Sequence, residues 1–131
     1  MRALVQRVSR ASVTVDDRLV GAIGPGLLVL LGISREDDAA AADRLADRVR
    51  ALRVFDDAEG RMNEALGERE ILCVSQFTLY GETRRGNRPS FAAAAPARRL
   101  SRCTCASARG PAPSAACSVR GWRSSWSTTV P

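Results

Sequence analysis

The 131-residue sequence contains no histidine and no lysine, and aromatic residues make up only 5% of it. Without histidine, the chain cannot form a Ser-His or Cys-His pair in which an imidazole activates a nucleophile. Histidine ligands for a catalytic zinc ion are also missing, and Cys103, Cys105 and Cys117 lack the paired spacing of a zinc site. A hydrolytic activity would therefore depend on substrate orientation and hydrogen-bond donors, and we expect neither a metal nor a cofactor.

Long apolar runs and a secretory leader are also lacking. No stretch of 18 apolar residues occurs, and the chain passes from Met1 directly into a strand-like pattern. We therefore expect a cytoplasmic protein with no membrane partner. Cys73 stands alone in an apolar run and is expected to be a small core residue, so the four cysteines do not indicate the disulfide framework of a secreted domain.

Acidic residues are missing after Glu82, which divides the chain into two parts of unlike charge. Residues 1–83 contain 11 arginines and 14 acidic residues, a net charge of −3, whereas residues 84–131 contain 9 arginines and no acid, a net charge of +9. Such a basic block is typical of nucleic-acid or membrane contact. Residues 92–131 show no helical or strand periodicity, however, and we predict that residues 97–131 are poorly packed or disordered.

The N-terminal part has the alternation typical of strands. In residues 3–8 and 11–15 the β-branched side chains alternate with polar ones, and a turn predicted at Asp16-Asp17 leads to residues 19–23. Residues 27–33 are continuously apolar, which indicates a central strand buried on both faces. These patterns predict a strand-rich α/β domain.

A helix and further strands are predicted next. Ser34 can cap the helix, with Asp37 in the capping-box position and acidic residues filling the first turn. Leu45, Val49 and Leu52 would form its buried face. A turn at residues 57–60 leads to Met62-Asn63, and residues 71–80 are predicted to form the next strong strand. The predicted order is strands, then one helix, then further strands.

The most informative segment is Ser75-Gln76-Phe77-Thr78-Leu79-Tyr80. By itself this hexapeptide could be an ordinary half-buried strand. It occurs, however, in one chain with residues 1–8, residues 26–32, Met62-Asn63 and Arg88-Pro89-Ser90-Phe91, in that order. This combination resembles the D-aminoacyl-tRNA deacylase family over residues 1–96, which implies a strand-rich mixed sheet or barrel-like fold that would be incomplete in this chain.

The resemblance implies an enzyme that hydrolyses the ester between a D-amino acid and the 3′ end of tRNA. It also implies a homodimer with active sites at the subunit interface. Ser75 and Gln76 would donate hydrogen bonds to the aminoacyl ester, and the backbone of Phe77 would line the pocket. Thr78 has been viewed in this family as a nucleophile, but no base lies nearby in sequence, so a positioning or water-orienting role is an equal alternative.

Substrate-binding residues are implied on either side of the hexapeptide. Arg84, Arg85 and Arg88 could bind tRNA phosphates, or they could simply belong to a solvated loop. Met62 and Asn63 could close a turn, although the resemblance suggests that they lie near the pocket.

The C-terminal third departs from the family. The resemblance implies a second signature, a strand leading into Asn-x-Gly-Pro-Val-Thr, whose Gly-Pro excludes L-amino acids from the partner's pocket; Gly110-Pro111 has none of the surrounding residues. Residues 122–131 can be encoded as TGG CGG TCG AGC TGG TCA ACG ACG GTC CCG, and removing the first two bases gives Ala-Val-Glu-Leu-Val-Asn-Asp-Gly-Pro. We therefore predict a family domain at residues 1–96 and an out-of-frame tail at residues 97–131.

Two other functions remain open from the sequence. The tail could make the protein a small basic RNA-binding module, with Trp122 and Trp126 stacking on bases. Alternatively, the chain could be a non-functional remnant that does not fold. If the tail is an RNA-binding module, truncation after Phe91 should remove the affinity for RNA.

Overall fold

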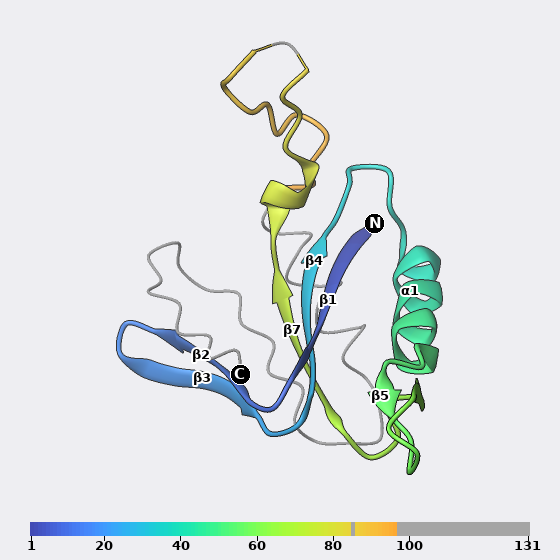
Figure 1. The fold of residues 1–131 in the computed structure, drawn as a ribbon. Helices are drawn as coiled ribbons and strands as arrows, with labels where there is room; N and C mark the ends of the chain where they lie inside the picture. The colour runs from blue at the N-terminus through green and yellow to red at the C-terminus, as the bar shows by residue number, and fades with distance from the viewer. Residues whose placement is uncertain (85, 97–131) are drawn as a thin grey trace.

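The computed structural model describes residues 1–84 and 86–96 (Figure 1). Eight elements of regular structure are followed by a short 3-10 helix, η1, and in chain order they are β1 (Arg2–Val8), β2 (Ala11–Val15), β3 (Arg18–Ile23), β4 (Gly26–Gly32), α1 (Ala39–Ala51), β5 (Phe55–Asp56), β6 (Met62–Glu64), β7 (Glu70–Ser75) and η1 (Phe77–Tyr80). The expected strand-rich α/β class is confirmed. Our predictions for residues 97–131 lie outside the described residues.

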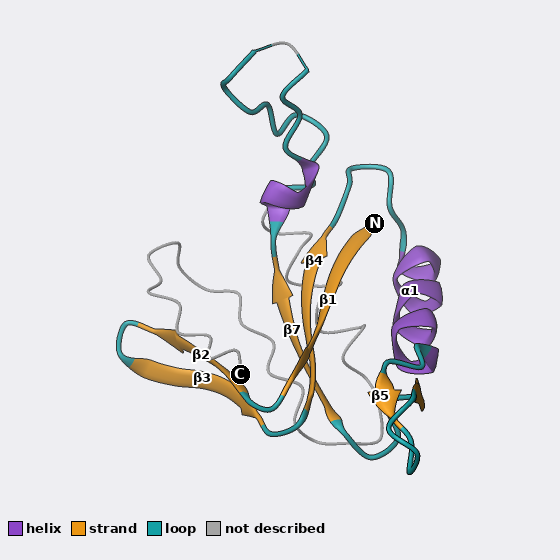
Figure 2. Ribbon diagram, viewed as in Figure 1, coloured by secondary structure: helices purple, strands orange, loops and turns teal. Residues whose placement is uncertain are grey.

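The central sheet is mixed, as the resemblance implied. Its strand order is β1-β4-β7, with β4 antiparallel to β1 and parallel to β7. The strands β2 and β3 form a separate antiparallel hairpin, and β5 and β6 form a shorter one. Figure 2 shows α1 beside the central sheet and the β2–β3 hairpin at the opposite side. The described strands therefore make one open sheet and two hairpins.

Strand β4 is buried on both faces, as its apolar sequence predicts. Leu27 and Val29 pack with Val49 of α1 on one face, whereas Leu28 packs with Leu72 of β7 on the other. Leu27 and Leu72 are completely buried. Burying one such side chain stabilises the fold by roughly 1.5–3 kcal/mol. The buried side chains of β4 therefore contribute strongly to the stability of the clusters on both faces of the sheet.

The helix begins later than the sequence predicted. Its N-cap is Asp38, whose carboxylate accepts a hydrogen bond of 2.7 Å from the Ala41 N–H, and its first turn contains no acid. The Ser34 N–H instead donates to the carboxylate of Asp37 at 2.7 Å, which keeps residues 34–37 outside the helix. The predicted Ser34 cap and acidic first turn are therefore wrong. Leu52 lies just beyond the helix and is 39% exposed.

The predicted strand at residues 71–80 is correct only up to Ser75. The Gln76 N–H donates to the Leu31 carbonyl at 2.8 Å, and the chain then turns into η1. This turn packs tightly against the end of β4: a Cβ added to Gly32 would lie 3.0 Å from the Cβ of Leu79. The small residue at the end of β4 thus allows the hexapeptide to fold over the sheet.

Candidate functional site

The hexapeptide lies beyond the carboxyl ends of the parallel strands β4 and β7. Ser75 is the last residue of β7 and pairs with Leu31 of β4. Figure 1 shows η1 directly after β7, with the following loop projecting away from the sheet. In open α/β sheets, binding sites usually form outside the carboxyl ends of the strands. The candidate catalytic residues 75–78 are therefore together at a suitable edge.

Gln76 and Thr78 form a hydrogen-bonded pair. The amide nitrogen of Gln76 donates to the hydroxyl oxygen of Thr78. Gln76 is half-buried and Thr78 is exposed, so the pair extends from the edge of the sheet to solvent. Because its oxygen accepts this bond, the Thr78 hydroxyl is polarised and its proton can be donated outward. The arrangement suits a group that orients an oxygen atom.

The loop after η1 is closed at its base. The ring centroids of Phe77 and Phe91 are 5.0 Å apart in an edge-to-face arrangement. Glu82 and Ser90 exchange two backbone hydrogen bonds of 2.9 Å each. These contacts join the two ends of the loop and attach it to the hexapeptide, so the loop arginines have a defined anchor beside Thr78.

The candidate arginines differ in their surroundings. The Arg84 guanidinium lies 3.1 Å from a carboxylate oxygen of Glu82, and the Arg84 side chain is 87% exposed. A backbone hydrogen bond from Arg84 is the main cause that lowers the pKa of Glu82, with the Arg84 charge adding to it. Arg88 is exposed on the same loop. Arg85 lies outside the described residues. Glu82 thus offsets part of the positive charge that Arg84 could offer to a phosphate.

Within one chain, Met62 and Asn63 are not brought to the hexapeptide. They belong to β6, which pairs with β5 near the far end of α1. The backbone carbonyl of Asn63 accepts a hydrogen bond of 2.6 Å from Arg53, whose guanidinium also donates to the Asn63 side-chain oxygen. Met62 is 65% exposed. Asn63 therefore has a structural role in this hairpin, and its contact with a substrate stays a prediction.

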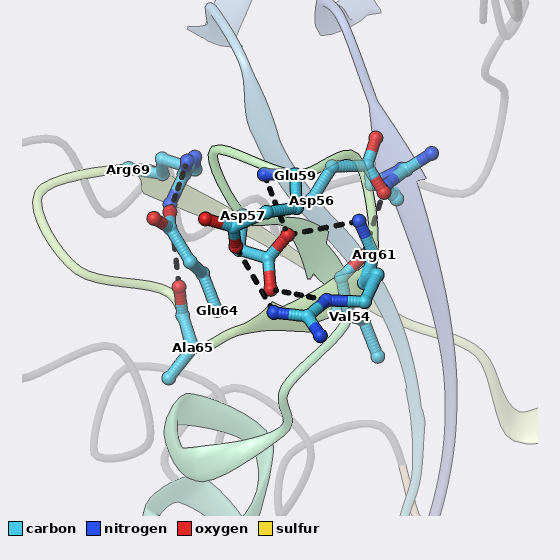
Figure 3. A network of polar contacts seen from close by, with 9 residues as sticks. Val54, Asp56, Asp57, Glu59, Arg61, Glu64, Ala65 and Arg69 are labelled. Carbon is cyan, nitrogen blue, oxygen red and sulfur yellow. Dashed lines mark hydrogen bonds and ion pairs between the residues drawn. The ribbon is translucent and has the colours of Figure 1, made fainter.

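The turn before Met62 is organised by Asp57 (Figure 3). One carboxylate oxygen of Asp57 accepts from the N–H groups of Glu59 and Arg61 at 3.0 and 2.9 Å, and the other lies 3.3 Å from the Arg61 guanidinium. The backbone hydrogen bond from Arg61 is the main cause that lowers the pKa of Asp57. Gly60 adopts a φ of 74°, which glycine tolerates best. The predicted turn at residues 57–60 is confirmed.

A small apolar cavity of about 30 Å³ lies between α1 and the sheet. Cys73 lines it together with aliphatic residues of both elements, Val29, Leu31, Ala42, Leu45, Ala46, Val49 and Ile71. Burial raises the pKa of the Cys73 thiol to about 12, so the thiol is un-ionised and a poor nucleophile. The expected core role of Cys73 is confirmed, and a space of about one water molecule is too small for an aminoacyl ester.

Comparison with known proteins identifies the family. Residues 4–110 match the family described as D-Tyr-tRNA(Tyr) deacylase. The chain belongs to this family. It is 63% identical over 97 residues to a D-aminoacyl-tRNA deacylase of Symbiobacterium thermophilum, covering 72% of this chain and 64% of the relative. A D-aminoacyl-tRNA deacylase of Anaeromyxobacter dehalogenans is 59% identical over 98 residues, with 73% and 66% covered. The chain thus spans just under two thirds of the length of these relatives.

Two solved structures are similar to this chain. A protein named c-Myc DNA unwinding element binding protein is 42% identical, with a TM-score of 0.74 over 82% of this chain and 73% of that chain. A probable eukaryotic D-amino acid tRNA deacylase is 19% identical, with a TM-score of 0.64 over 98% and 85% of the two chains, and this likeness concerns the fold alone. The resemblance inferred from the motifs is confirmed.

In the described part of the chain, the single helix is too short and polar to cross a membrane.

One residue that contacts the hexapeptide was not found from the sequence. Arg2 donates to the Leu79 carbonyl at 2.7 Å, and its guanidinium lies 4.6 Å from the centre of the Tyr80 ring. The sequence separation of 77 residues between Arg2 and Leu79 leaves no local pattern that could have indicated this contact.

Proposed function

We propose that the complete enzyme, with its reading frame restored, hydrolyses D-aminoacyl-tRNA, releasing a free D-amino acid and tRNA. Membership of the family and the names of its close relatives support this function over the RNA-binding alternative. The structural observation that carries the proposal is the hydrogen-bonded pair of Gln76 and the exposed Thr78 beyond the end of β7. The proposal concerns the whole enzyme, of which the chain spans just under two thirds.

In this proposal, Ser75, Gln76 and Thr78 orient the ester and stabilise the charge that develops on its carbonyl oxygen. Water adds to the ester carbon, the bond to the ribose oxygen breaks, and the proton released by water compensates the leaving ribose oxygen. A hydroxyl of the terminal ribose can assist this proton transfer, since the chain contains no histidine. Oriented donors of this type typically contribute about 10²–10³-fold in rate.

The geometry favours a positioning role of Thr78 over a nucleophilic one. A nucleophilic hydroxyl needs a base that accepts its proton. The partner of Thr78 is instead the Gln76 amide, which donates to the hydroxyl oxygen and so withdraws electron density from it. The hydroxyl proton is left as a donor toward the substrate.

We further propose tRNA as the macromolecular partner, and a second copy of the chain as the other half of the active site. Arg88 would contact the tRNA backbone most freely, with Arg84 and Arg85 beside it on the loop. Met62 and Asn63 would contribute to binding only where the assembled enzyme brings β6 near a bound tRNA. The proposed location is the cytoplasm, where tRNA is aminoacylated.

The proposed domain limits are residues 1–96 for the deacylase domain and 97–131 for an out-of-frame tail. The relatives match 97 or 98 residues, which agrees in length with this boundary, although the family model extends its match to residue 110. In the intact reading frame, the missing strands would complete the barrel-like fold and supply the Gly-Pro element. Sequencing the coding DNA around codons 94–100 tests this proposal directly.

Substitutions in the hexapeptide test the site. In a version with the frame restored, Gln76→Ala and Thr78→Ala should each lower the rate of D-tyrosyl-tRNA deacylation by roughly ten- to a thousand-fold. Ser9→Ala, in the exposed turn between β1 and β2, is the matched control and should keep full activity. Unchanged turnover in both hexapeptide variants would overturn the assignment.

The reading frame is tested by comparing the 131-residue chain with the restored protein. The present chain should be inactive or nearly so and should aggregate, because lost strands leave a sheet edge and apolar surface uncovered. Any remaining activity should also hydrolyse L-tyrosyl-tRNA, because the Gly-Pro element that excludes L-amino acids is missing. The measurements are deacylation of both substrates and light scattering. A monodisperse dimer of the 131-residue chain that cleaves only the D-ester would contradict the frame change.

A further inference from the structure

Three segments that are distant in sequence meet around the end of η1. The first is the start of β1, where the Arg2 guanidinium donates to the Leu79 carbonyl at 2.7 Å. The same guanidinium lies 4.6 Å from the centre of the Tyr80 ring. One side chain therefore contacts both final residues of η1, through a charge-assisted hydrogen bond and a cation–π contact.

The second contact comes from the loop between β4 and α1. Burial first, and then the charge of Asp37, raise the pKa of the Tyr80 hydroxyl, so the Asp37 carboxylate acts electrostatically on Tyr80. The Asp37 carboxylate accepts from the Ser34 N–H at 2.7 Å and from the Met1 ammonium at 2.6 Å. Burial alone would raise the pKa of Asp37, but the bonds from the ammonium and from Ser34 outweigh burial and lower the pKa. Asp37 is therefore a carboxylate at neutral pH.

These contacts fix the end of the turn, while a different contact fixes its beginning. The Gln76 N–H donates to the Leu31 carbonyl at 2.8 Å, and the Gly81 N–H closes the turn on the Thr78 carbonyl at 2.9 Å. Thr78 lies between the two fixed points and is itself exposed. Its position therefore depends on contacts at both ends of the turn, with Arg2 at one end and the sheet at the other.

We propose that Arg2 and Tyr80 form a clamp that positions the Gln76–Thr78 pair for the substrate. Neither side chain touches the proposed reacting atoms, so both are positioning residues. The inference rests on the proposed function for its catalytic meaning, but the clamp itself can be measured without activity. Loss of the clamp should release η1 while the central sheet stays folded.

The test uses the frame-restored protein and hydrogen exchange followed by NMR. Arg2→Gln should accelerate exchange of the Gly81 amide by about tenfold, because a charge-assisted bond to the turn is lost, and should shift the side-chain amide signals of Gln76. Exchange of the Leu30 amide in β4 should stay unchanged. Arg2→Lys, which keeps a cation and a donor, should restore most of the protection. Tyr80→Phe, which keeps the ring contact with Arg2 and loses only the hydroxyl, should have a smaller effect.

Arg10→Gln is the matched control, since Arg10 is an exposed arginine in the turn after β1. If Arg2→Gln behaves like Arg10→Gln, the clamp does not exist. If it accelerates exchange of Gly81 and Leu30 equally, Arg2 only stabilises the fold, and the proposal is also wrong. Deacylation is measured separately on the unmutated frame-restored protein: its absence there would count against the proposed function and leave the exchange result to decide the clamp.

Discussion

Strand β4 and the η1 turn pack against each other, yet different properties of the sequence determine them. In β4 nearly every residue is buried, and what matters is apolar volume on both faces. In η1 no residue is buried, and the conformation depends on single hydrogen bonds with Leu31 and Arg2. The difference indicates that stability and function can be altered separately in this domain, and four experiments test this separation.

The largest effect should come from emptying the core. Leu27→Ala removes a completely buried side chain and should reduce the free energy of unfolding by about 4 kcal/mol, through lost burial and the cavity left behind. Urea unfolding measures this change. Leu19→Ala is the control, since Leu19 is 66% exposed, and it should change the free energy by less than about 0.5 kcal/mol. Equal effects would show that β4 does not govern stability.

The next effect concerns backbone packing at the start of β4. A Cβ added to Gly26 would lie 2.0 Å from the Glu70 carbonyl oxygen, so the β4–β7 pairing would have to shift. We expect Gly26→Ala to destabilise the domain by about 3 kcal/mol, the upper end for overpacking. Gly24→Ala adds the same methyl group where nothing lies within 4 Å and should be nearly neutral. Similar midpoints of urea unfolding for both variants would contradict the close approach.

A smaller, pH-dependent effect is expected at Asp37. Its pKa is lowered in the folded state, so its contribution to stability is present above the ordinary value of 3.8 and is lost as the pH falls through the lowered value. Asp37→Asn should therefore destabilise the protein at pH 7 and progressively less below pH 3.8. Urea unfolding at several pH values measures this dependence. A destabilisation that stays constant down to acidic pH would show that the carboxylate charge is unimportant.

The smallest effect on stability should be that of Thr78→Ala. Because Thr78 is exposed, its removal should change the free energy of unfolding by less than about 0.5 kcal/mol. The same substitution in the frame-restored enzyme should strongly reduce deacylation, as proposed above. Urea unfolding and deacylation on the same preparation separate the two results. Loss of stability in parallel with activity would mean that the turn belongs to the core.

Much of the fold was predictable because its signals are local or periodic. Alternation identified β1 and β2, the predicted turn at Asp16-Asp17 indicated β3 after it, and the continuous apolar run identified β4. The errors occurred where a distant contact decides between two local possibilities. Ser34 has the sequence of a cap, but the carboxylate of Asp37 engages its N–H group and is itself bound by the Met1 ammonium. Residues 77–80 have the composition of a strand, but they leave the sheet where Gly32 makes room for them.

The candidate site shows the same division. The hexapeptide could be selected from the sequence because its residues are contiguous and occur with other family motifs. The sequence did not predict the hydrogen bond between Gln76 and Thr78, the ring contact with Phe91 or the contact with Arg2. No shared local pattern links the residues that make these contacts. The sequence by itself determined the apolar core, the family and the chemistry that is impossible without histidine. Only the tertiary structure decided which polar groups meet, because a hydrogen bond requires positions within about 3 Å that chain folding alone provides.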